Sequence, residues 1–156
     1  MKSDIDGVII TKKDLHEDQR GWLIEIFRQD ELDNSHFPVM SYLSMTKSGE
    51  SRGPHEHIKQ TDLFFFWGTS TFKLYLWDNR SDSETFKKSS ILTIPVGEQY
   101  SVIVPPGVVH GYKNIGEFEG LIINAPNQLH AGQGRGESVD VVRYEDDPEC
   151  RFRMED

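Results

Sequence analysis

Cysteine is nearly missing from this sequence, because Cys150 is the only one among 156 residues. An internal disulfide is therefore excluded, and a reducing, cytoplasmic setting is expected. Long apolar runs are missing as well, since none approaches the roughly 20 residues that a membrane helix needs. The opening MKSDIDGVII has no long apolar region followed by small residues, so no signal peptide is expected. These absences predict a soluble protein with no membrane partner.

Basic residues are also scarce. The chain has 17 Lys and Arg against 26 Asp and Glu, which gives a net charge of -9. Such a charge disfavours a nucleic acid as partner, because its phosphate backbone is itself negative. A small anionic ligand remains compatible, since it needs only a few local arginines. The length fits a single domain, residues 1–156, that is large enough to bury a core.

Long helical patterns are missing too. Only RQDELDNS could form one or two helical turns, and the rest consists of short apolar or alternating runs separated by Gly, Pro, Asn and Asp. Seven runs are predicted to be strands: GVIIT, GWLIEIF, VMSYLSMT, DLFFFW, TFKLYLWD, YSVIVP and EGLIINA. The aromatic residues of DLFFFW are expected in the core. Many short strands with frequent turns predict an all-β protein, either a closed barrel or a double-sheet β-sandwich.

Two histidine motifs carry the chemistry. In RGPHEHIKQTD, His55 and His57 lie two residues apart, so on a strand they would point the same way and enter a barrel together. In PPGVVHGYKN, a Pro-x-Gly turn would bring His110 to face them on another strand. With Asp62, these imidazoles could hold a metal ion, or a histidine could carry protons near neutral pH. The residues alone do not decide between a metal site and a histidine that transfers protons.

Both motifs resemble those of a known superfamily. The first reads G-x5-H-x-H-x4-D-x5-G from Gly49 to Gly68, and the second reads P-x-G-x2-H-x3-N from Pro105 to Asn114. Together they are similar to the two motifs of the cupins, which are small jelly-roll barrels. The second match is close, whereas in the first Asp62 stands where many cupins have Glu. The resemblance implies a cupin-type jelly-roll barrel with few short helices and a site at one mouth.

A second resemblance covers most of the chain. The segments DQRGWLIEIFR, SRGPHEH, LWDNRSDSETF, PPGVVHGY and RYEDDP occur in the order and spacing of the dTDP-4-dehydrorhamnose 3,5-epimerases. That family is a metal-free branch of the cupin-like barrels. The resemblance implies an isomerase that removes a proton beside the C4 ketone of a dTDP-4-keto-6-deoxyhexose, in cell-surface polysaccharide synthesis. It also implies that no cofactor is needed.

The resemblance assigns roles residue by residue. His55 becomes the base, and His110 becomes the second-motif histidine near the sugar. Arg52 becomes a contact to the nucleotide sugar, as arginines clamp a diphosphate bidentately. Arg20 and Glu25 match the nucleotide-binding pair of the family.

Three departures keep alternatives open. The acidic tyrosine of the family falls near Ile123, and its active-site lysine falls at Asp62, which we keep as a candidate substrate contact. His57 stands where the family usually has another residue, and an H-x-H pair resembles the sugar-nucleotide 3,4-ketoisomerases, so His57 is a further catalytic candidate. The alternatives are such a ketoisomerase, a non-catalytic nucleotide-sugar-binding cupin, or a metal-dependent cupin enzyme with these ligands: His55, His57, Asp62 and His110.

A homodimer is expected as well. The N-terminal run GVIIT is rich in β-forming residues and is predicted to be an edge strand. A second subunit often covers such an edge. The epimerase resemblance implies the same assembly.

Overall fold

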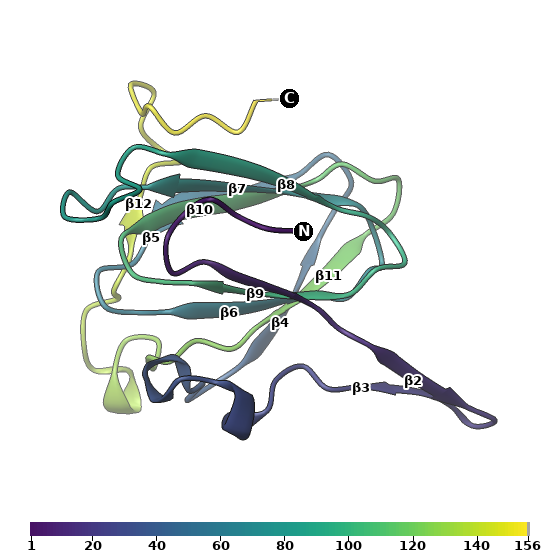
Figure 1. The fold of residues 1–156 in the computed structure, drawn as a ribbon. Helices are drawn as coiled ribbons and strands as arrows, with labels where there is room; N and C mark the ends of the chain where they lie inside the picture. Colours follow the sequence, from purple (N-terminus) through teal and green to yellow (C-terminus); the bar gives the residue numbers. More distant parts are fainter. Residues whose placement is uncertain (156) are drawn as a thin grey trace.

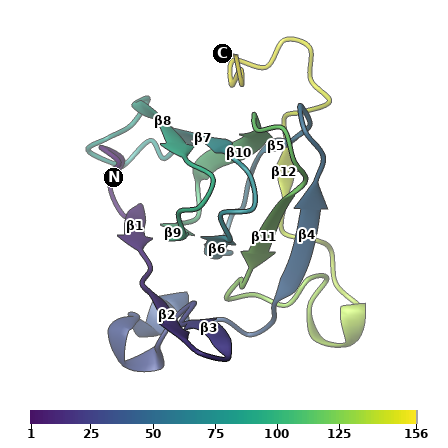
Figure 2. The same ribbon diagram turned by 90° about the vertical axis from the view of Figure 1, so that its right-hand side faces the viewer.

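The computed structural model describes residues 1–155 and consists mainly of two facing antiparallel sheets (Figures 1 and 2). The strands of the first sheet, in spatial order, are β1 (Ile9–Lys12), β9 (Tyr100–Val104), β6 (Asp62–Phe66), β11 (Gly120–Asn124) and β4 (Tyr42–Thr46). Those of the second are β12 (Val142–Arg143), β5 (Ser51–Glu56), β10 (Val108–Asn114), β7 (Phe72–Asp78) and β8 (Ser89–Ile94). The predicted cupin-like, all-β jelly-roll architecture is confirmed.

A hairpin lies outside these two sheets. Strands β2 (Leu15–Asp18) and β3 (Gly21–Ile24) pair only with each other and extend away from the barrel (Figure 1). Two short 3-10 turns, Gln29–Glu31 and Asn34–His36, follow it and confirm the helical turns predicted in RQDELDNS. A third covers Gln133–Arg135. No helix within residues 1–155 is long and apolar enough to cross a membrane.

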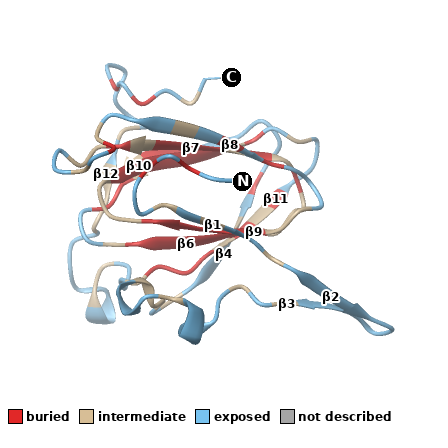
Figure 3. Ribbon diagram, viewed as in Figure 1, coloured by how far each residue is buried: buried red, intermediate tan, exposed pale blue. Residues whose placement is uncertain are grey.

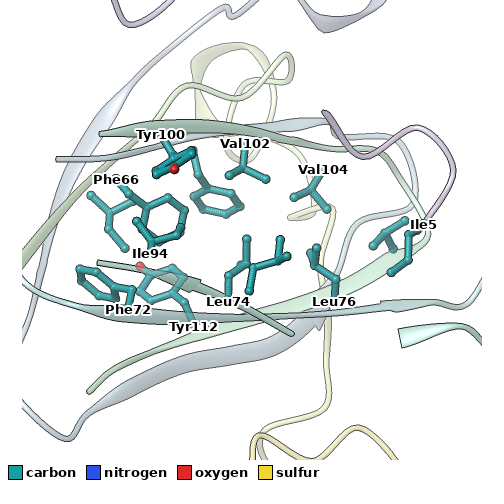
Figure 4. Close-up of a cluster of buried hydrophobic side chains, with 14 residues drawn as sticks. Ile5, Phe66, Phe72, Leu74, Leu76, Ile94, Tyr100, Val102, Val104 and Tyr112 are labelled. Carbon is teal, nitrogen blue, oxygen red and sulfur yellow. The ribbon is translucent and has the colours of Figure 1, made fainter. Parts of the chain in front are cut away.

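Alternating side chains from facing strands fill the barrel interior (Figure 4). Buried residues, which are coloured red in Figure 3, are concentrated on the strands of the two sheets. On β7, Phe72, Leu74 and Leu76 are fully buried in this core, as the alternation predicted. The core also takes alternate residues of β6, β9 and β10: Phe64, Phe66, Tyr100, Val102, Val104, Val108 and Tyr112. Burial of such apolar side chains is worth roughly 1.5–3 kcal/mol each, so this interior is what holds the two sheets together.

Two aromatic residues differ from the sequence expectation. Trp67 is only half-buried and packs 4.8 Å, between ring centroids, from Trp22 of the β2–β3 hairpin. Tyr75 alternates with the inner residues of TFKLYLWD and so lies on the other face of β7, yet it is fully buried as well. Residues following β12 lie against that outer face, where Phe152 packs on Trp77. A strand covered on both sides does not show a polar face, which explains the difference.

A polar cluster holds the turn between β7 and β8. The buried Asp78 carboxylate accepts hydrogen bonds from the Arg80 guanidinium, Ser83 Oγ and Thr85 Oγ1. The Arg80 backbone N–H donates to it as well. Burial alone would raise the pKa of Asp78, but these donors outweigh it, so the pKa lies well below its usual range. The D-x-R-x-x-S-x-T-F pattern of the sequence is therefore a structural turn.

Candidate functional site

The three motif histidines converge inside the barrel. His110 on β10 pairs directly with His55 on β5, and their ring centroids are 4.5 Å apart. The two rings therefore face each other, as the motif spacing predicted. His57 follows the end of β5, with its ring 5.3 Å from that of His55. Asp62 of the facing sheet completes the group, because one ligand atom from each of the four residues lies within 4.8 Å of the others.

A β-bulge in β5 places the side chains of Arg52 and His55 on the same face of the sheet. Opposite Gly111 of β10, strand β5 has two residues, Gly53 and Pro54, so the register shifts by one. Arg52 and His55 are three apart, and without this bulge they would face opposite sides of the sheet. With it, Arg52 lies opposite the core residue Tyr112. Gly53 has φ +83°, and a Cβ there would lie 2.7 Å from a backbone carbonyl oxygen.

Substitution of Gly53 tests this bulge. Gly53→Ala should lower the free energy of unfolding by about 2–4 kcal/mol, because left-handed strain adds to a backbone clash. Gly49→Ala is the matched control, since Gly49 has φ +80° but open space around its Cβ position. It should cost only the strain, about 1–2 kcal/mol. Urea denaturation measures both, and equal losses would contradict the crowding at Gly53.

Asp62 is the electrostatic centre of the site. Its carboxylate is 1% exposed, and Oδ1 accepts hydrogen bonds from the amides of Gln60, at 2.8 Å, and Asn124, at 2.9 Å. Oδ2 lies 3.1 Å from His110 Nε2 and 3.3 Å from His57 Nε2. Burial would raise the pKa of Asp62, but the two imidazoles and the hydrogen bonds they offer lower it. The carboxylate is therefore ionised.

The three imidazoles differ in environment. His57 Nδ1 contacts the Asp140 carbonyl, and His110 Nδ1 lies 2.9 Å from the Val108 carbonyl. Burial lowers the pKa of His57, but the neighbouring Asp62 outweighs it and the net pKa is raised. Burial, together with the charges of His110 and His57, lowers the pKa of His55 to about 3. His55 is thus neutral near pH 7, with a ring that can accept a proton.

Other polar groups reach the site from β4 and β11. Asn124 donates to Tyr42 Oη at 2.8 Å as well as to Asp62, so it ties a phenol to the carboxylate. Ile123, matched to the acidic tyrosine of the family, lies on the other face of β11, opposite the exposed Leu43. The neighbouring position 122 is the one that points into the core.

Two sequence-predicted contacts lie elsewhere. Arg20, at the turn of the β2–β3 hairpin, pairs with Asp18 at 2.5 Å, and Glu25 lies 3.4 Å from Arg28. Because the hairpin leaves the barrel, the structure does not bring Arg20 and Glu25 to the histidines of their own chain (Figure 1). Arg52 lies closer, and its guanidinium donates to the Met45 carbonyl at 3.1 Å.

Sequence reasoning missed three residues that support the site, namely Gln60, Asn124 and Asp140. Gln60 stands between the H-x-H pair and Asp62, and Asn124 is a polar residue at the buried end of an apolar strand. A polar residue between two motif residues, or at the end of an apolar strand, is a sequence signal that predicts a contact with the site. Asp140 follows a polar, glycine-rich segment, where no pattern distinguishes it.

The fold and the site define a cupin-like barrel with a cluster of three histidines and a carboxylate inside. A family model described as dTDP-4-dehydrorhamnose 3,5-epimerase matches residues 2–133. The chain belongs to this family.

Individual relatives agree with that assignment. The chain is 36% identical to the spore coat polysaccharide biosynthesis protein SpsL of Bacillus subtilis, over 76% of this chain and 78% of that protein. It is 32% identical to the probable low-salt glycan biosynthesis epimerase Agl13 of Haloferax volcanii, over 81% of each. Among solved structures, a dTDP sugar isomerase from Desulfovibrio desulfuricans G20 aligns with a TM-score of 0.77 at 21% identity, over 92% of this chain and 87% of that one. That likeness concerns the fold.

Proposed function

We propose that the chain is an isomerase that moves protons beside the C4 ketone of a dTDP-4-keto-6-deoxyhexose, in the synthesis of a surface polysaccharide or glycan. Family membership and the name of Agl13, a probable epimerase, support this class of reaction. The names of SpsL and Agl13 support a role in polysaccharide or glycan synthesis. The observation that carries it in the structure is a neutral His55 next to two further imidazoles and an ionised carboxylate.

His55 serves as the base in this proposal. The ketone acidifies the neighbouring C–H bonds, so His55 can take a proton while the bonding electrons form an enolate. A pKa near 3 makes free His55 a weak base. The arriving diphosphate and the growing enolate charge would raise the pKa, because negative charge favours the imidazolium. Return of a proton to the opposite face of the ring completes an epimerisation, and Arg52 would hold the diphosphate.

A 3,4-ketoisomerase is the second candidate. It is favoured by the position of His57, whose ring lies in the same cluster and not on the surface. Two adjacent histidines could remove a proton at C3 and deliver one at C4. Both candidates begin with the same enolate.

One experiment tests the function and separates the candidates. The protein is incubated with dTDP-4-keto-6-deoxyglucose in deuterated water, and the products are followed by NMR. Deuterium at both C3 and C5 indicates 3,5-epimerisation, and deuterium at C3 alone indicates 3-epimerisation. Deuterium at C4 of a 3-keto product indicates a 3,4-shift. No label at any of these carbons would contradict an enzyme of this class and favour a nucleotide-sugar-binding module.

We also propose a cytoplasmic homodimer. β1 and β4 are the two edges of the first sheet, so the predicted edge position of the N-terminal strand is confirmed. Exposed apolar side chains lie on β4 (Leu43, Met45) and on the hairpin (Trp22, Leu23), and a second copy could cover them. Arg20 and Glu25, which lie on and just beyond this hairpin, would reach a nucleotide only across such an interface. Light scattering should give a dimer, and a monomer at all concentrations would count against it.

A further inference from the structure

The proposed reaction needs an acid, and no residue has yet been assigned to that role. His55 removes a proton, and another group must return one to the enolate from a different side. The Nδ1 atoms of His57 and His110 face backbone carbonyls, and their Nε2 atoms face Asp62, which would hold any proton there. Ile123 has no proton to donate and lies on the outer face of β11. These residues leave the acid to another part of the barrel.

Tyr42 of β4 lies on the inner face of the first sheet. Side chains alternate along this strand, so that Ser44 contacts the core residue Tyr112 whereas Leu43 is exposed on the outer face. Tyr42 is two residues from Ser44 and therefore shares its inner face. Its partner across the strands is Asn124, which is 2% exposed. The ring of Tyr42 is half-exposed, while its phenol oxygen reaches the buried amide.

The amide of Asn124 orients the phenol and leaves its hydrogen free. Asn124 Nδ2 donates to Tyr42 Oη at 2.8 Å and to Asp62 Oδ1 at 2.9 Å, so both amide hydrogens are used. The phenol oxygen accepts in this contact, and within residues 1–155 its own O–H has no protein acceptor. A phenol has one hydrogen to donate. That hydrogen is therefore available to a ligand beside the Asp62 carboxylate.

The charges around Tyr42 suit a group that keeps its proton until the reaction takes it. Partial burial raises the pKa of Tyr42 and outweighs the hydrogen bond from Asn124, and the negative Asp62 raises it further. The phenol is thus protonated near pH 7. The positive Arg52 acts in the opposite direction, so it would stabilise the phenolate that remains once the proton has left.

We propose that Tyr42 is the catalytic acid that returns a proton to the enolate. This assignment rests on the proposed function. Tyr42 and His55 come from the facing sheets, on β4 and β5, so a sugar ring held between them would have the acid on one face and the base on the other.

The proton transfers balance without a cofactor. His55 takes the C3 proton and becomes an imidazolium, while the electrons of the C–H bond form the enolate. The O–H bond of Tyr42 then breaks, its proton and an electron pair of the enolate form the new C–H bond, and the ketone is restored. The new bond is at C3 in an epimerisation and at C4 in a 3,4-shift. Solvent takes the proton from His55 and returns one to the phenolate.

The test is Tyr42→Phe, which removes the O–H and keeps the ring. The full chain is incubated with dTDP-4-keto-6-deoxyglucose in deuterated water and followed by NMR. Formation of the epimerised or 3-keto product should slow by about 100-fold or more, as expected for loss of a general acid. Deuterium should still enter C3 of the unreacted sugar within about fivefold of the wild-type rate, because His55 can return a solvent deuteron to the face that it deprotonated.

Tyr112→Phe is the matched control. Tyr112 is also an inner-face tyrosine, but its phenol oxygen lies 3.3 Å from Ser44 Oγ and it packs in the core. This variant should change product formation and C3 exchange by less than about threefold. Both variants should melt within a few degrees of the wild type, which shows that any loss of rate is not a loss of fold.

The outcomes separate this assignment from the proposed function. Wild type that forms product, together with Tyr42→Phe that forms it equally fast, overturns the acid and leaves the proposed function intact. Equal loss of product and of C3 exchange in Tyr42→Phe also overturns it, since a residue that only shapes the site would lower both. Loss of product in Tyr112→Phe alone would move the role to Tyr112. Wild type that gives neither label nor product contradicts the proposed function itself.

Discussion

His55→Asn should remove nearly all exchange between solvent and the C3 and C5 protons of the substrate. The amide keeps roughly the size and polarity of the ring but cannot accept the proton, and a general base contributes on the order of 10²–10⁴-fold. His55 is partly exposed at the end of the barrel, so the variant should fold with an unchanged melting temperature to within a few degrees. NMR in deuterated water measures the exchange, and calorimetry with dTDP should show unchanged nucleotide binding.

Two further histidines provide comparisons. His16 lies on the exposed hairpin, and His16→Asn should leave exchange unaltered. His57→Asn should lose exchange if the ketoisomerase pair or a bound ion is used, and should keep most of it if His55 acts alone. Near-normal exchange in His55→Asn would show that another residue is the base. It would contradict the role that the family resemblance assigns to His55.

Asp78→Asn should lower the free energy of unfolding by about 3–5 kcal/mol, as expected when one partner of a buried ion pair is removed. The carboxylate gathers donors from Arg80, Ser83 and Thr85, whereas an amide has one acceptor oxygen and turns an N–H₂ group toward them. Urea denaturation measures the loss. The exposed Asp82, in the same turn, is the matched control, and Asp82→Asn should change stability by less than about 0.5 kcal/mol.

The effect of Asp78 should also depend on pH in a defined direction. Its pKa is lower in the folded state than the value near 3.9 of an unfolded chain. The carboxylate therefore contributes its full stabilisation above about pH 4–5 and loses it as the pH falls through the folded pKa. The stability difference between the wild type and Asp78→Asn should shrink from pH 7 toward about pH 2. A difference that stays constant over this range would contradict the lowered pKa.

Much of the barrel was predictable because its strands bury one face. The alternation of Phe72, Leu74 and Leu76 predicted β7 and its inner side correctly. β8 was missed, since its SSILTI sequence is half polar and lies at a sheet edge, where exposed serines hide the pattern. The strand of GWLIEIF was predicted, but its position in a hairpin outside the barrel depends on pairing that no local pattern shows.

The candidate site, like the barrel, could be predicted from the sequence only in part. The motif spacings predicted the meeting of His55, His57 and His110, because i, i+2 geometry and a Pro-x-Gly turn are local properties. The partners of Asp62 were not predicted, since the contact with Asn124 joins strands 62 residues apart in sequence. The register shift at Gly53 was not predicted either, because a bulge depends on the facing strand.

Asp140 connects the first histidine motif to a segment that lies outside it. Its carboxylate accepts hydrogen bonds from the backbone N–H groups of Ile58, Lys59 and Gln60, and its carbonyl accepts one from His57. The family match ends at residue 133. A fragment that ended there would keep His55, His57 and His110 but would lose the hydrogen bonds that Asp140 makes with the first motif. In this chain the position of His57 therefore depends on a segment that lies beyond the part of the sequence that the family model matches.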